Sequence, residues 1–133
     1  MSNRRAASRT RYLSREPRTL LCKFTSTGAT GDQTLTDSGP FNHGIVNVNC
    51  TANGTYVIAL GSGATSRDTY AGLAGVDFVV DETDRKLNYA TDGSTTAANP
   101  TVTLYVTESA VGTEFITNTK IAWVRLHFVD SAD

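Results

Sequence analysis

Long apolar segments are absent from this chain. No run of about 18 or more apolar residues occurs in its 133 residues, which argues against a transmembrane helix and a membrane partner. The arginine-rich start is not followed by an apolar segment, so we expect no secretory signal, and its hydrophobic positions are too few for an amphipathic transit peptide. At this length the chain is expected to fold as one domain with a sizeable core.

Cysteines are scarce as well. Cys22 and Cys50 each lie in an alternating apolar segment. We expect them to be small buried side chains of a protein in a reducing compartment, with a disulfide between them as the alternative. Two thiols do not complete a structural zinc site, and His43 and His127 are not spaced to supply the missing ligands. Neither a metal nor another cofactor is therefore expected.

Motifs for nucleophilic catalysis are incomplete. Gly61-Ser62-Gly63 is a glycine-flanked serine, but the G-x-S-x-G spacing fails because Leu60 and Ala64 occupy the outer positions. His127 lies in the middle of an expected strand and His43 in a loop, so neither is placed as a base beside this serine. We predict no catalytic residue and a protein that is not an enzyme.

The acidic residues 81, 82 and 84 form the densest acidic group. They lie in one polar turn between two expected strands, where a solvated turn explains them. Their spacing also departs from the EF-hand loop, which needs a central glycine and a distal glutamate. Neither an acid–base pair nor a calcium site is predicted.

Charge is distributed very unevenly. Residues 1–23 hold seven of the twelve basic residues and one of the thirteen acids, so a basic start precedes an acidic remainder. Residues 1–18 have no apolar periodicity, and we expect them to form a flexible arm that a partner orders. Pro17 disfavours helix before it and marks the start of the first strand. The predicted partner-binding residues of the arm are Arg4, Arg5, Arg9, Arg11, Tyr12, Arg15 and Arg18.

Arginine pairs with phosphates and with carboxylates, so two kinds of partner suit the arm. Nucleic acid is disfavoured because the remainder of the chain is acidic and Tyr12 is the one aromatic residue among the arginines. An acidic protein surface, including that of a neighbouring copy, is the favoured partner. A plain solubilising tail remains the alternative.

Period-two alternation predicts β-strands in the rest of the chain. Leu20, Cys22 and Phe24 mark the first. The Asn53-Gly54 pair predicts a type I′ hairpin that joins about 44–51 to about 55–61. Further strands are expected at 76–80, 87–89 and 102–106, with a short turn at 70–73 and loops at 61–75, 91–100 and 108–119.

The last predicted strand is the longest. Val124, Leu126 and Phe128 should face one side, and Trp123, Arg125 and His127 the other, as a candidate interface. Strands spaced about ten to twenty residues apart, without a helical pattern, indicate an all-β fold: an antiparallel β-sandwich or barrel over residues 19–133, preceded by the basic arm.

Five stretches of the chain form a recognisable succession: A-N-G-T-Y-V-I-A-L at 52–60, Y-A-G-L at 70–73, the strand at 76–80, T-V-T-L-Y-V at 101–106 and W-V-R-L-H-F-V at 123–129. In this succession the chain resembles a family of small bacteriophage virion proteins. The resemblance covers about two thirds of the chain and does not include the arm. It implies a β-rich structural protein of the capsid decoration (cement) type, without enzymatic activity.

The resemblance also implies a location and partners. The protein would be made in the host cytoplasm and bind the exterior of the virion, with the major capsid protein as partner and a homo-oligomer, a trimer favoured over a dimer, as the bound form. The arm would then dock on the acidic shell, and many weak contacts would add up. The alternative is a tail-associated or carbohydrate- and receptor-binding module, for which Trp123, Tyr105 and Tyr89 are the candidate aromatics.

Overall fold

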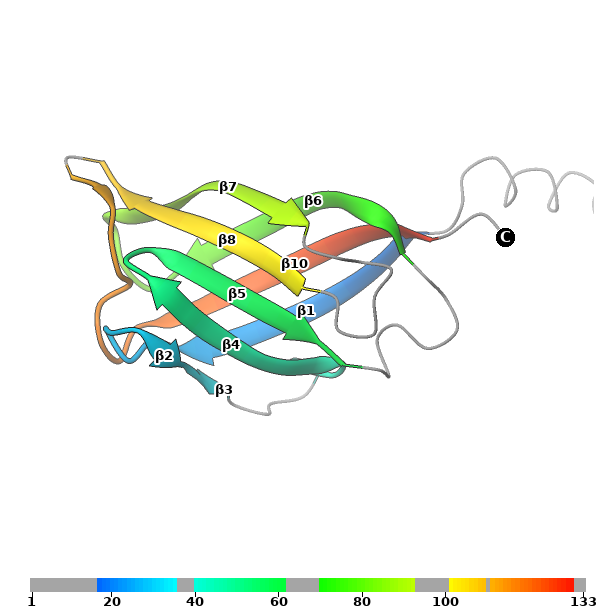
Figure 1. Cartoon of the computed structure of the whole chain (residues 1–133), viewed down its shortest axis with the longest axis horizontal. Helices are drawn as coiled ribbons and strands as arrows, with labels where there is room; N and C mark the ends of the chain where they lie inside the picture. The colour runs from blue at the N-terminus through cyan, green and yellow to red at the C-terminus, as the bar shows by residue number, and fades with distance from the viewer. Residues whose placement is uncertain (1–16, 36–39, 62–69, 93–100, 110, 131–133) are drawn as a thin grey trace, which may run out of the picture.

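Two antiparallel β-sheets pack face to face in the computed structural model of the chain (Figure 1). The structure describes residues 17–35, 40–61, 70–92, 101–109 and 111–130, and no helix occurs in these ranges, so none of them contains a helix that could cross a membrane. The predicted all-β class and the β-sandwich are confirmed. Short turns of polar residues separate several of the strands, as expected where the alternation of apolar and polar residues stops.

The four-stranded sheet contains both ends of the described chain. Its order is β3 (Thr34–Leu35), β1 (Pro17–Thr25), β10 (Ile121–Asp130) and β6 (Tyr70–Val80). The first and last long strands are therefore neighbours, paired from Pro17 opposite Val129 to Thr25 opposite Ile121. Pro17 begins β1, as the sequence indicates.

The second sheet has six strands. Its order is β2 (Gly31–Asp32), β4 (Ile45–Ala52), β5 (Thr55–Leu60), β8 (Thr101–Glu108) and β7 (Arg85–Asp92), with β9 (Gly112–Thr113) paired to β8. The hairpin of β4 and β5 confirms the predicted pairing of 44–51 with 55–61.

The core lies between the sheets and is made by the inward members of each alternating strand. Phe24 of β1 and Tyr56 of β5 meet there, with ring centroids 5.5 Å apart. Cys22 and Cys50 are both buried and unbridged, which confirms the prediction that they are small core side chains. The other fully buried large side chains are Val48, Ile58, Val102, Leu104, Val106, Ile116, Val124, Leu126 and Phe128.

Some local predictions differ from the structure. Residues 70–73 are the start of β6 and not a turn, because β10 supplies a partner strand that overrides the local preference of Gly72. The hairpin turn at Asn53-Gly54 is not type I′, since Gly54 has a φ of 78° while Asn53 is not among the residues with positive φ; a register shift between Cys50 and Ala52 absorbs the extra residue. The strand expected at 87–89 is present but longer, since β7 runs from Arg85 to Asp92. The loop predicted at 108–119 contains the two-residue strand β9, which pairs with β8.

Candidate functional site: the outer face of the four-stranded sheet

Trp123, Arg125 and His127 lie together on the outer face of β10. Their neighbours Val124 and Leu126 are buried, so the predicted division of the last strand into two faces is confirmed. Since β10 lies between β1 and β6, its outward side chains form the centre of the exposed face of the sheet.

The strand register arranges this face in three cross-strand rows. Side chains directly opposite in antiparallel strands are close enough to interact. The first row, nearest the end of β1, contains Lys23, Trp123 and Val79. The second row contains Leu21, Arg125 and Asp77, and the third contains Thr19, His127 and Gly75.

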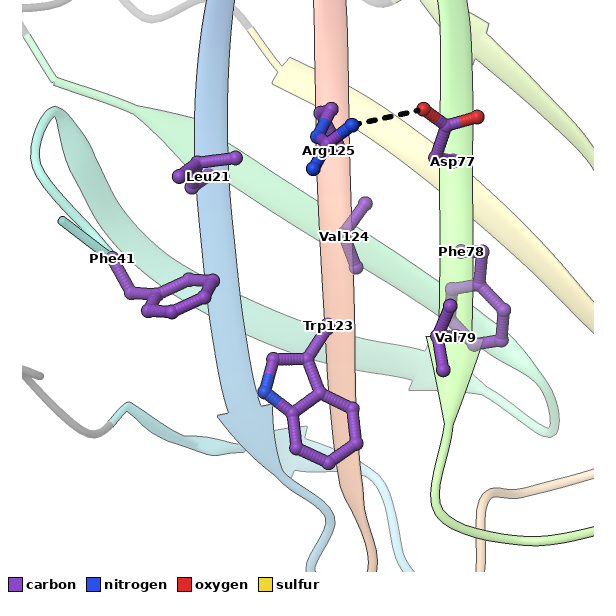
Figure 2. A pocket seen from close by; sticks show the side chains of 8 residues that line it. All are labelled: Leu21, Phe41, Asp77, Phe78, Val79, Trp123, Val124 and Arg125. Atoms are coloured by element: carbon purple, nitrogen blue, oxygen red, sulfur yellow. Dashed lines mark ion pairs between the residues drawn. The ribbon is translucent and has the colours of Figure 1, made fainter.

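A shallow depression of about 610 Å³ lies on the first two rows. Figure 2 shows Trp123, Phe41 and Val79 at one end of it and the Arg125–Asp77 ion pair at the other. Val79 is 61% exposed, which is high for an apolar side chain in a strand. The full lining consists of Leu21, Phe41, Asp77, Phe78, Val79, Trp123, Val124 and Arg125.

Phe41 reaches this face because Asn42 attaches its turn to the edge of β1. Asn42 has a φ of 69°, a left-handed conformation that asparagine tolerates better than most residues. Its side chain accepts a hydrogen bond from Lys23 N at 2.9 Å and donates to Lys23 O at 3.0 Å, while its own N–H donates to Leu21 O at 2.7 Å. Lys23 Nζ lies 5.8 Å from the centre of the Phe41 ring, within range of a cation–π contact.

Asp77 organises the polar end of the face. Its Oδ2 lies 2.9 Å from His127 Nε2 and 3.9 Å from Arg125 Nη1. The hydrogen bond with His127 lowers the pKa of Asp77, and the charge of Arg125 acts in the same direction. The side chains of Asp77 and Arg125 are 64% and 58% exposed, so water screens this pair and it orients the two groups more than it stabilises the fold.

Thr19, His127 and Asp77 form a series of a hydroxyl, an imidazole and a carboxylate, in which each group lies next to the following one. Thr19 Oγ1 lies 3.4 Å from His127 Nδ1, longer than the usual distance between a nucleophile and its base. Neither Thr19 nor His127 contributes to the lining of the depression. The hydroxyl and the imidazole of the series therefore lie on the sheet surface outside the depression.

Most of the predicted arm lies outside the described residues, namely Arg4, Arg5, Arg9, Arg11, Tyr12 and Arg15. Arg18 is placed in β1, opposite Phe128, and so belongs to the sheet. Ser62 of the glycine-flanked serine also lies outside the described ranges. Among the described residues, no group of three or more histidines, cysteines and acids is arranged to hold a metal ion.

A second aromatic group occurs on the outer face of the six-stranded sheet. Tyr89 of β7 stacks on Tyr105 of β8, with centroids 4.3 Å apart and planes 19° from parallel. Tyr89 is 51% exposed. The candidate aromatics Trp123, Tyr105 and Tyr89 are therefore divided between opposite faces of the sandwich and form no single cluster.

Sequence patterns missed Phe41 and did not show that Asp77 meets Arg125. The alternation predicted a strand at 76–80 but could not show which strand lies beside it. Comparisons of the chain with protein-family models, with curated proteins and with solved structures find no match. The geometry of these surfaces and the resemblance of the sequence segments are therefore the features that bear on function.

Proposed function

We propose that this protein is a non-enzymatic structural protein of a bacteriophage virion, which binds the capsid exterior and stabilises the shell. Its basic arm docks on an acidic surface of the major capsid protein, and the outer face of the four-stranded sheet continues the contact. The protein is made in the host cytoplasm and binds as a small homo-oligomer.

The continuity between the arm and the outer face is the observation that carries this proposal. The arm leads directly into β1 at Pro17, and β1 then contributes Leu21 and Lys23 to the face that holds Trp123 and Arg125. A surface that binds the arginines is therefore brought next to this face. Tryptophan and arginine are the side chains that most often dominate the binding energy of protein interfaces.

The charge of the face fits an acidic partner. Lys23 and Arg125 are cationic, and the one carboxylate in the three rows, Asp77, is paired with Arg125 and His127. The half-buried Trp123 and the exposed Val79 offer apolar area at the centre of such a contact. Arginines at the rim would speed association, and the apolar centre would slow dissociation.

Binding to purified shells that lack this protein tests the proposal. Deletion of residues 2–16 should lower occupancy and remove most of its salt dependence, because contacts with the arginines are screened by salt. Trp123→Ala should lower affinity about tenfold at every salt concentration, as expected for a central aromatic anchor. Tyr89→Ala, on the opposite face, is the matched control and should bind normally. Full occupancy by both the deletion and Trp123→Ala would overturn the proposal.

A second candidate function rests on the Tyr89–Tyr105 stack. An exposed tyrosine face can pack against a sugar ring, which suits a tail-associated carbohydrate- or receptor-binding module. A glycan array distinguishes the two functions. Binding that is lost in Tyr89→Ala and kept in Trp123→Ala would favour the module, and an array without binding would remove it.

A further inference from the structure

The four strands that end the two sheets differ in how their edges are protected. β2 and β3 are only two residues long, and turn residues cover part of the strands behind them: Asn42 bonds the backbone of β1, and Gln33 N–H donates to Val48 O at 2.8 Å. β7 carries Arg85, Lys86 and Asp92 and has a register shift between Leu87 and Tyr89. Short length, charge and irregularity are the usual protections against unwanted strand pairing.

β6 has none of these protections over most of its length. It is the longest strand, at eleven residues, and it contains no proline or lysine and one charged residue, Asp77. Within the described residues it pairs with β10 alone. Two register shifts, near Ala71 and near Ala74, interrupt its first half, where Leu73 N–H donates to Asp92 Oδ2 of β7 at 2.7 Å. Residues 75–80 form an unbroken edge.

The ladder with β10 identifies the backbone groups of this edge that no described strand bonds. Asp81 N–H donates to Ile121 O at 2.9 Å, which makes residues 81 and 121 a hydrogen-bonded pair. Such pairs alternate along an antiparallel ladder, so Val76, Phe78 and Val80 direct their N–H and C=O groups away from β10. β6 and β7 run along the same side of the sandwich (Figure 1), and a depression of about 280 Å³ between them is lined by residues 73–76 of β6 and by Leu87 and Ala90 of β7.

We propose that the β6 edge pairs with the β6 edge of a second copy of this chain, antiparallel about a two-fold axis at Phe78. In this register Phe78 faces Phe78 of the partner subunit, and Val76 faces Val80 of the partner subunit. All of the outward-directed backbone groups at these positions are then hydrogen-bonded. The two four-stranded sheets become one continuous sheet.

The position of Asp77 and the regular part of β6 favour an axis at Phe78 over axes at neighbouring residues. An axis at Asp77 would place the two Asp77 carboxylates directly opposite each other, which is unfavourable. An axis nearer Gly75 would bring Ala74 and its register shift into the ladder, and one nearer Val80 would extend into the 81–84 turn. With the axis at Phe78, the exposed Val79 lies opposite Asp77 of the partner subunit.

A second copy fits this edge better than the arm does. Residues 1–16 lack the alternation of a strand, and Asp77, the acid beside the edge, is already paired with Arg125 and His127. Among the described strands β6 has the one unprotected edge, and pairing through it closes the assembly at two, so this surface forms a dimer where the resemblance implied a trimer. The contact is smaller than the roughly 1,600 Å² of a standard interface, and we expect association at micromolar concentrations.

Sedimentation velocity of the full chain across a range of concentrations tests the dimer, with circular dichroism to confirm folding. Val79→Asp places a second carboxylate opposite Asp77 of the partner subunit, once on each side of the axis, and should weaken dimerisation about tenfold. Val79→Lys places a cation opposite each Asp77 and should strengthen dimerisation several-fold at low salt, with the gain lost at high salt. Val46→Asp and Val46→Lys are the matched controls, since Val46 of β4 is also 61% exposed, and neither should change the dimer.

A chain that remains monomeric at every concentration, or that forms a trimer, overturns the proposal. So does a dimer that Val79→Asp and Val79→Lys shift in the same direction, or one that responds equally to the Val46 variants. The measurement uses the isolated protein and no shell, so its outcome is independent of the proposed function.

Discussion

The phenol of Tyr56 accepts a hydrogen bond from the backbone N–H of Ile116 at 2.8 Å, across 60 positions of the chain. Both residues are fully buried. Ser26 Oγ donates to Ile116 O at 2.7 Å, so the N–H and C=O of Ile116 are both satisfied from other parts of the fold. The segment that leads into β10 is thereby attached to Tyr56, in the six-stranded sheet, and to Ser26, which directly follows β1 of the four-stranded sheet.

Tyr56→Phe should destabilise the protein although it removes a single oxygen. The Ile116 N–H would be left buried without a partner, which costs about 1–3 kcal/mol. Urea unfolding followed by circular dichroism measures this loss. Tyr105→Phe, on the half-exposed outer face of β8, is the control and should change the free energy of unfolding little. Equal effects of the two variants would contradict a structural role for this bond.

Gly54→Ala should be among the most damaging small substitutions. Gly54 has a φ of 78°, and a Cβ there would lie 2.6 Å from Val106 O and 2.8 Å from Glu114 N. Backbone atoms cannot move aside cheaply, so we expect a loss of more than about 2 kcal/mol. Gly112→Ala is the matched control because Gly112 has a φ of 99° with open space around it, and it should show the strain of positive φ alone. Thermal unfolding compares the two; a Gly112→Ala loss as large as that of Gly54→Ala would refute the clash.

Alkaline pH should unfold the protein through its buried thiol and phenol. Burial raises the pKa of Cys22 from 9.0 to about 12 and that of Tyr56 from 10.0 to about 12. The unfolded chain ionises at the ordinary values, so stability is complete below pH 9.0 and is lost as the pH rises toward 12. Cys22→Ala should make the free energy of unfolding fall less steeply above pH 9.0, whatever its cost at neutral pH. An unchanged slope would show that Cys22 ionises equally in both states.

Acid pH should act through Glu82. Burial raises the pKa of its carboxyl, but hydrogen bonds from the N–H and hydroxyl of Thr117, with the charges of Arg85 and Lys120, outweigh burial and lower the pKa from 4.5. The resulting stability is present above pH 4.5 and is lost as the pH falls through the lowered pKa. Glu82→Gln should flatten the dependence of unfolding free energy on pH below 4.5. Parallel pH curves for the wild type and Glu82→Gln would contradict this role.

Alternation along the sequence was sufficient to predict most strands. It assigned the pairing of β4 with β5 and the two faces of β10 correctly, because a side chain in a strand is directed by its position and not by its neighbours. It failed at residues 70–73, where glycine and alanine interrupt the pattern. There the strand exists because β10 offers hydrogen-bonding groups over its full length, which no local pattern records.

The candidate surface was less predictable than the fold. Trp123, Arg125 and His127 could be assigned to one face from their spacing alone. Phe41 could not, because it reaches this face through Asn42, whose side chain pairs with backbone atoms of Lys23. Nothing in the local sequence distinguishes such an asparagine from one in an ordinary turn.

By itself the sequence determined the class of fold and the separation of a basic start from an acidic remainder, since period-two alternation and charge counts do not depend on which strands become neighbours. Only the tertiary structure decided that β1, β10 and β6 lie side by side, and hence that Asp77 meets Arg125 and that β6 ends its sheet. Strand order depends on the paths of the connections and on the relative free energies of competing long-range pairings. Those are properties of the whole chain, and they bring together residues that no local segment contains.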